Sequence, residues 1–175
     1  IVAYKQDLTG KRLSGEFPSQ LDFCQFHELS TVHGCSGEFS LIFPTALAKR
    51  YPFPVFEGER FVTESVVYDR ISPVCPMLLL PVVVMLCEYQ QEGYSSNANA
   101  VMARNPAGYC LYFMQRMDVL PSVKGRMISA GKYWCFRFIS GNQTLKYRGK
   151  HRLLWLAGWP LGVLFRIYYK VRRGI

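Results

Sequence analysis

Short apolar runs and helix-like periodic segments alternate along the first two thirds of the chain. Residues 1–4 and 39–43 are apolar runs beside turn-forming residues, which predicts two strands. Residues 77–87 form the longest run, and their β-branched centre predicts a buried strand. Because proline cannot donate to a strand ladder, this strand is expected to begin near Pro81 or to lie at a sheet edge. Strands mixed with helices indicate an α/β fold.

Helical periodicity and capping residues mark the other elements. Thr63 and Ser95 are expected to cap helices, because a hydroxyl oxygen accepts from the N–H groups that a helix start leaves free. Pro106 suits a first helical position, where no N–H is needed. The predicted helices are residues 21–29, 45–50, 63–71, 95–104, a segment that begins at 106, and 122–139.

The most apolar segment is residues 153–169. It is shorter than the roughly 20 residues that a membrane span needs, and it contains Gly158, Pro160, Gly162 and Arg166. Basic and aromatic residues flank it, which favours an amphipathic helix in the headgroup zone of a membrane. A helix packed on the protein core is the alternative.

Charge is distributed unevenly along the chain. The net charge is +9, yet residues 1–118 hold 9 Lys and Arg against 12 Asp and Glu. Residues 119–175 hold 12 Lys and Arg and no acidic residue. Positive charges that have no acidic residues between them repel one another. Such a segment therefore indicates an anionic partner. Lipid headgroups and nucleic acid are the two candidates.

The cysteines give no sign of a metal finger. None of the six forms a Cys-x-x-Cys pair or has a histidine at finger spacing. We interpret them as small buried hydrophobic residues in a reducing cytosol. No signal-peptide pattern is present, and a chain that starts in a strand is expected to be part of a longer protein.

Candidate chemistry gathers in residues 53–64. Glu57, Glu59 and Glu64 lie within eight residues of each other, on a loop that leads into a predicted helix. Carboxylates in this position suit general acid–base work. They also suit a purely structural role, because acidic side chains are favourable at a helix start.

This region resembles the family-2 glycosyltransferases of the GT-A type. Residues 58–64 read Gly-Glu-Arg-Phe-Val-Thr-Glu, and Arg70 follows Glu64 by six residues. In the commoner form of the family motif a Glu-Asp pair stands where Thr63 and Glu64 stand here. The resemblance extends over roughly residues 1–140. Its other parts are residues 7–11, 33–38, 88–97, 105–108 and 133–134.

The resemblance implies a fold and a reaction. The fold would be part of a GT-A domain, residues 1–145, that lacks the N-terminal donor-binding half, followed by a basic amphipathic helical tail, residues 146–175. The reaction would be the inverting transfer of a sugar to a hydroxyl group, with Glu64 as general base and Glu59 as the second choice. Residues expected to contact donor or acceptor, or to brace the motif, are Gly34, Gly37, Glu38, Arg70, Tyr94 and Asn97.

The resemblance also implies ligands and a location. The partners would be a nucleotide-sugar donor and a glycan or lipid-linked acceptor. Mg²⁺ or Mn²⁺ would be held by an Asp-x-Asp motif, which residues 1–175 do not contain. The metal ligands are therefore expected outside this chain, which is expected to be inactive alone. The setting would be polysaccharide assembly, such as capsule synthesis, at the cytoplasmic face of a bacterial membrane, with the tail on anionic lipid.

Two other functions compete with this interpretation. The basic, aromatic C-terminal third suits a nucleic-acid-binding module. However, no zinc finger or RNA-binding aromatic signature is present, so we do not expect a nucleic-acid partner. The second alternative is an inactive assembly domain that keeps the glycosyltransferase shape.

Overall fold

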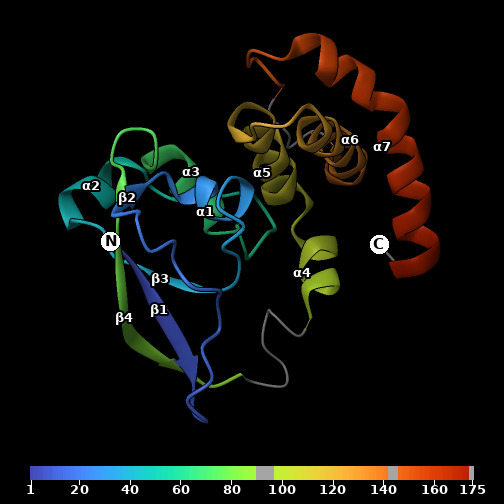
Figure 1. Ribbon diagram of the computed structural model, residues 1–175. Coiled ribbons are helices and arrows are strands. Elements are labelled where there is room, and N and C mark those ends of the chain that lie inside the picture. Colours follow the sequence, from blue (N-terminus) through green and yellow to red (C-terminus); the bar gives the residue numbers. More distant parts are fainter. Residues whose placement is uncertain (90–96, 142–145, 174–175) are drawn as a thin grey trace. The chain divides into compact units, whose positions relative to one another are not determined.

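The chain forms two compact units in the computed structural model, which describes residues 1–89, 97–141 and 146–173. The first unit comprises Ile1–Pro52 and Val67–Gln91, and the second comprises Phe53–Val66 and Glu92–Ile175. Within the described residues there are four strands and seven helices (Figure 1). The predicted mixed α/β class is therefore confirmed.

One sheet of four strands organises the first unit, in the order β2-β4-β1-β3. Strand β1 (Val2–Asp7) runs parallel to β4 (Met77–Cys87) and antiparallel to β3 (Phe39–Leu41). Strand β2 (Phe23–Cys24) pairs with the first residues of β4. The strands expected at 1–4 and 39–43 are thus present with shifted ends, and the apolar run 77–87 is a strand over its whole length.

Pro81 lies in the part of β4 that β2 does not reach. Strand β2 pairs only with Met77 and Leu78. The β1–β4 register then jumps from Leu80 to Val83, which leaves Pro81 in a bulge. Strand β4 begins four residues before Pro81 and lies between β2 and β1, so neither expectation holds for the strand as a whole. Only locally, beyond its two residues paired with β2, does β4 leave a place for a proline. The predicted burial holds only for Met77 and Leu79, because residues 82–86 are exposed.

The segment 21–29 is a helix only in its second half. Phe23 and Cys24 form β2, and helix α1 (Phe26–Thr31) begins after Gln25. Gln25 and Glu28 form a reciprocal capping box that fixes this start. The helix prediction for residues 21–24 was wrong because pairing with β4 outweighs local periodicity. The core of this unit is built from Val2, Tyr4, Cys24, Leu29, Cys35, Phe39, Met77 and Leu79.

Two short helices complete the region before β4. Helix α2 (Thr45–Arg50) follows Pro44, and helix α3 (Ser65–Ile71) begins two residues after Thr63. The backbone carbonyl of Thr63 accepts from the Val66 N–H at 3.0 Å. Both helices agree with the sequence prediction, to within two residues for α3.

The second unit contains four helices among its described residues. They are α4 (Ala98–Arg104), α5 (Pro106–Val119), α6 (Val123–Ser140) and α7 (Arg152–Arg173). Pro106 is the first residue of α5, and the Ser122 hydroxyl caps α6 by accepting from the Gly125 N–H at 3.0 Å. The predicted helix starts at Pro106 and near Ser122 are confirmed, and the capping bond of Ser122 is a finding of the structure. The expected cap Ser95 lies outside the described residues.

Helix α7 runs without a break through Gly158, Pro160 and Gly162 and packs along α6 (Figure 1). A Cβ on Gly158 would lie 2.5 Å from the Ala130 Cβ, and one on Gly162 would lie 2.4 Å from the Trp134 Cβ. The glycines therefore allow close helix contact and do not interrupt the helix. No described helix is long and apolar enough to cross a membrane.

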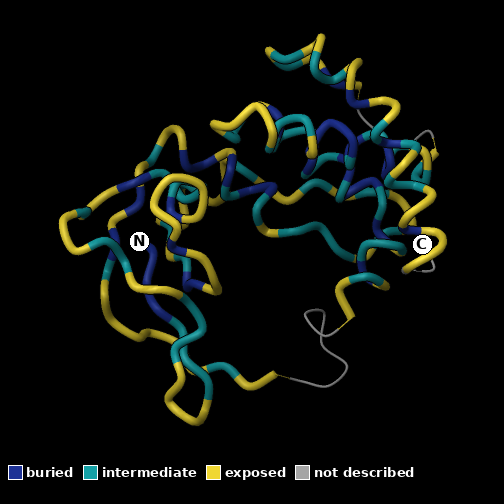
Figure 2. Tube along the Cα trace, turned by 45° about the vertical axis from the view of Figure 1, so that its right-hand side comes forward, coloured by how far each residue is buried: buried dark blue, intermediate teal, exposed yellow. Residues whose placement is uncertain are grey.

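The buried hydrophobic residues form one core cluster in each unit. The backbone tube in Figure 2 colours buried residues dark blue. All six cysteines are free thiols, and four of them are buried. Burial raises the pKa of Cys24 and of Cys135 to about 11, which keeps both thiols protonated near neutral pH. The interpretation of the cysteines as small core residues holds for these four.

Candidate functional site

Glu59 binds the start of helix α5 with both carboxylate oxygens. The N–H of Ala107 donates to Oε1 at 2.6 Å, and the N–H of Gly108 donates to Oε2 at 2.9 Å. The first N–H groups of a helix have no partner within the helix, and the helix dipole favours an anion there. Glu59 is therefore an N-terminal ligand of α5, and both of its oxygens are engaged in the fold.

Asn105 completes this connection from the other side. Its Oδ1 accepts from the N–H groups of Arg60, at 2.8 Å, and Phe61, at 2.9 Å. Its Nδ2 donates to the Val101 carbonyl at 2.7 Å. The side chain is buried, so leaving these N–H groups unpaired would cost free energy. We call the bonds of Glu59 and Asn105 the Glu59–Asn105 clamp.

The backbone at Gly108 also lies close to the segment that carries Glu59. A Cβ added to Gly108 would lie 3.2 Å from the Phe61 carbonyl oxygen and 3.4 Å from Glu59 Oε2. The rings of Phe61 and Tyr109 stack 6.3 Å apart. Residues 58–64 and 105–108, two parts of the resemblance some 45 residues apart, are therefore each other's structural partners.

Glu64 is in a different environment from Glu59. It is exposed and directly precedes α3. Within the described part of the chain, no hydrogen bond or ion pair engages its carboxylate. A carboxylate with open oxygens is able to accept a proton from an incoming group.

Arg60 and Arg104 line the same hollow, of about 770 Å³. Both side chains are exposed, and neither takes part in an ion pair with a described residue. Asn97, a predicted contact residue, lies on the wall of this hollow with the buried Asn105. Guanidinium groups bind phosphate and carboxylate oxygens well, so the hollow suits an anionic group.

A second hollow, of about 300 Å³, lies on the same segment and is more apolar in lining. It is formed by residues 53–56 and 59–62. Phe53 and Val55 are exposed there. Sugar rings present apolar faces, so an aromatic and aliphatic wall of this kind suits a glycan as well as a lipid chain.

The predicted glycine turn belongs to the first unit. Gly34 has φ +66° and open space around its missing side chain. Gly37 has φ +125°, and a Cβ there would lie 2.4 Å from the Ser14 Cα. Gly37 thus lets the backbone approach its own chain, whereas Gly34 leaves room beside the turn.

Glu38 and Arg70 each have a partner in the first unit. The Tyr89 hydroxyl donates to the Glu38 carboxylate, and this bond raises the pKa of Tyr89 to about 12. Arg70 donates to the Pro52 carbonyl at 3.4 Å and stacks over the Tyr51 ring. Arg70 therefore braces the connection after α2. Tyr94 lies outside the described residues.

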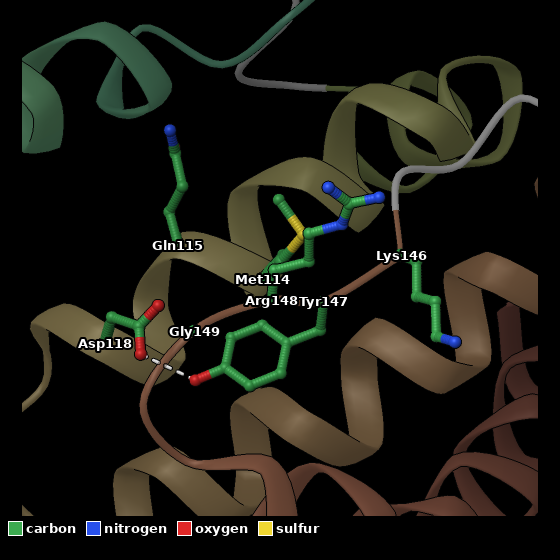
Figure 3. Close-up of a pocket in the computed structure, with 7 residues that line it drawn as sticks. All are labelled: Met114, Gln115, Asp118, Lys146, Tyr147, Arg148 and Gly149. Atoms are coloured by element: carbon green, nitrogen blue, oxygen red, sulfur yellow. Dashed lines mark hydrogen bonds between the residues drawn. The ribbon is translucent and has the colours of Figure 1, made fainter.

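Asp118 organises a third hollow, of about 530 Å³, between the end of α5 and the start of α7 (Figure 3). The Tyr147 hydroxyl donates to Asp118 Oδ1 at 2.6 Å and accepts from the His151 N–H at 2.9 Å. Burial, followed by this bond to Asp118, raises the pKa of Tyr147 to about 12. This network holds the first turn of α7.

The described residues provide no group of three His, Cys, Asp or Glu side chains that would hold a metal ion. The divalent cation that the resemblance implies therefore has no ligand set among them.

Sequence reasoning missed three contributors to this region. Asn105 was noted only as part of a resemblance, although an Asn before a helix-starting Pro is a common turn signal. Arg60 and Arg104 were not selected at all. The sequence gives no sign that these two arginines line one hollow, because 44 residues separate them. The clamp brings their segments together in the fold.

Comparisons of the chain with protein-family models, with curated proteins and with solved structures give no match.

Proposed function

We propose that this chain is the acceptor-side part of an inverting family-2 glycosyltransferase. The observation that carries the proposal is the Glu59–Asn105 clamp. It joins two separate parts of the family-like pattern and leaves the last acid of the motif, Glu64, exposed. A pattern that matched by chance would have no reason to pair in this way.

In the proposed reaction Glu64 acts as general base. Its carboxylate takes the proton of the acceptor hydroxyl as that oxygen forms a bond to the anomeric carbon of the donor sugar. The bond from this carbon to the nucleotide diphosphate breaks, and the diphosphate leaves with the electron pair. Attack from the opposite side inverts the configuration. Glu59 is the weaker candidate for the base, because both of its oxygens already accept N–H groups.

The two hollows supply binding surfaces for this reaction. Arg60, Arg104 and Asn97 would bind an anionic group of the acceptor, such as a phosphate or a uronic acid. The apolar wall at residues 53–56 would contact the sugar ring or the lipid part. The nucleotide and its divalent cation would be held by residues outside 1–175.

The test compares two glutamates in the enzyme that includes the donor-binding half. Glu64→Gln keeps the shape and removes the base, so turnover should fall at least about a hundredfold, with little change in donor affinity. Glu57→Gln is the matched control, an exposed glutamate of the same segment, and should leave turnover within about twofold. Equal turnover of the two variants would refute the assignment of Glu64. Absence of any sugar transfer by the unaltered enzyme would favour the assembly-domain alternative.

A further inference from the structure

The two faces of α7 differ sharply in burial. Its inner face, which carries Gly158, Gly162 and Tyr169, is buried within the second unit. At about 100° per residue, six residues of the opposite face fall within an arc of about 80°. We call them the outer stripe: Leu153, Leu156, Pro160, Leu164, Ile167 and Val171.

The outer stripe is apolar and exposed along the whole helix. Its five large aliphatic side chains are between 55% and 84% exposed, and Pro160 is exposed as well. Isolated exposed aliphatic residues are normal on a protein surface. An unbroken row from Leu153 to Val171, nearly the whole length of α7, is not normal, and such patches mark interaction surfaces.

Basic and aromatic side chains border the stripe. Arg152, Trp159 and Lys170 are exposed along one edge, and Tyr168 is exposed along the other. Residues 119–175 contain no acidic side chain that would neutralise these cations. An apolar face bordered by Lys, Arg, Trp and Tyr matches the boundary between lipid headgroups and acyl chains.

The inner contacts determine how lipid would meet this helix. Trp134 of α6 stacks on Trp155, with ring centroids 4.9 Å apart, and its Nε1 donates to the Trp155 carbonyl at 2.7 Å. With one face held against α6, α7 offers only the other face to lipid. No described helix is long and apolar enough to cross a membrane. The helix must therefore lie in the plane of the surface.

We propose that the outer stripe of α7 docks on an anionic lipid bilayer, with the helix axis parallel to the membrane. The aliphatic side chains enter the acyl boundary while Arg152 and Lys170 meet anionic headgroups. The inference concerns a surface of the second unit and does not depend on sugar transfer. It says which face of α7 meets the lipid and how the helix axis lies on the membrane, and the basic composition alone predicts neither.

A rigid start to the helix supports this orientation. The Tyr147 hydroxyl donates to Asp118 (Figure 3). It also accepts from the N–H of His151, the residue directly before α7. The close contacts at Gly158 and Gly162 fix the rotation of the helix about its axis. The stripe is therefore presented outward before any lipid is bound, which lowers the entropy cost of docking.

A second copy of the chain is the less suitable occupant. Packing two outer stripes together would bring two basic, acid-free segments side by side, and their repulsion opposes association. Anionic lipid has the complementary charge. Nucleic acid shares that charge but offers no apolar layer to bury Leu153 or Ile167.

The experiment measures co-sedimentation of the purified chain with vesicles. One set is phosphatidylcholine alone, and the other is phosphatidylcholine and phosphatidylglycerol in equal parts. We expect binding to the anionic vesicles that weakens as salt is raised, because salt screens the headgroup attraction. Leu164→Glu should lower the partition coefficient at least about tenfold.

Val74→Glu is the matched control. Val74 lies in the first unit and is 61% exposed, against 62% for Leu164. Both variants add one charge at an exposed aliphatic position, so both should keep the far-ultraviolet circular dichroism of the unaltered chain. Equal loss of vesicle binding in the two variants would overturn the proposal. It would also be overturned by a dimer that Leu164→Glu dissociates, or by DNA binding without vesicle binding.

Discussion

The glycine turn of the first unit and the Glu59–Asn105 clamp of the second belong to the same family-like pattern, yet the fold uses them differently. In the clamp, the side-chain oxygens accept hydrogen bonds from backbone N–H groups. In the turn, Gly34 faces open space, while only Gly37 is pressed against its own chain. A sequence pattern therefore mixes residues whose side chains hold the backbone with residues beside which space stays open, and the contacts distinguish the two kinds.

Removing the Asn105 half of the clamp should have the largest effect on stability. Asn105→Ala leaves the Arg60 and Phe61 N–H groups without their acceptor and the Val101 carbonyl without its donor. We expect the free energy of unfolding to fall by about 3–4 kcal/mol. All three tryptophans lie in the second unit, so urea unfolding followed by their fluorescence reports on it.

Asn105→Asp distinguishes the contribution of the Asn105 acceptor oxygen from that of its Nδ2 donor, in the same unfolding measurement. It keeps an oxygen for both N–H groups, but it replaces the Nδ2 donor by a second carboxylate oxygen that faces the Val101 carbonyl in a buried position. Because the acceptor is retained, its loss should be smaller than that of the alanine variant. If the two variants unfold at the same urea concentration, the clamp does not act through its acceptor.

Gly37→Ala tests the tight half of the turn. The added Cβ would meet the Ser14 Cα and the Leu13 carbonyl oxygen, at a φ that disfavours L-residues. Because the obstacle is backbone, relief requires movement of the chain. We expect a loss of about 3 kcal/mol, measured by urea unfolding followed by far-ultraviolet circular dichroism.

Gly34→Ala tests the open half and should have the smallest effect. Nothing lies within 4 Å of its added Cβ, so only the positive φ opposes the change. The expected loss is about 1 kcal/mol or less, since alanine also restricts the unfolded chain. If this variant were as unstable as Gly37→Ala, the contrast between the two halves of the turn would be lost.

Local signals predicted where most helices begin. Pro106 begins α5 because a first helical residue needs no N–H, and the periodic segment predicted from residue 122 begins as α6 at Val123. The same reasoning failed for residues 21–24. Their helical spacing was outweighed by pairing with β4, more than 50 residues later in the chain.

The sequence by itself determined the mixed α/β class, most helix starts, and the acid-free charge of the last third. Only the tertiary structure decided which glutamate is bound and which is open, and which face of α7 stays exposed. Capping and periodicity act over about four residues. Glu59 meets its partners 48 and 49 residues away, so its state depends on how the whole chain folds.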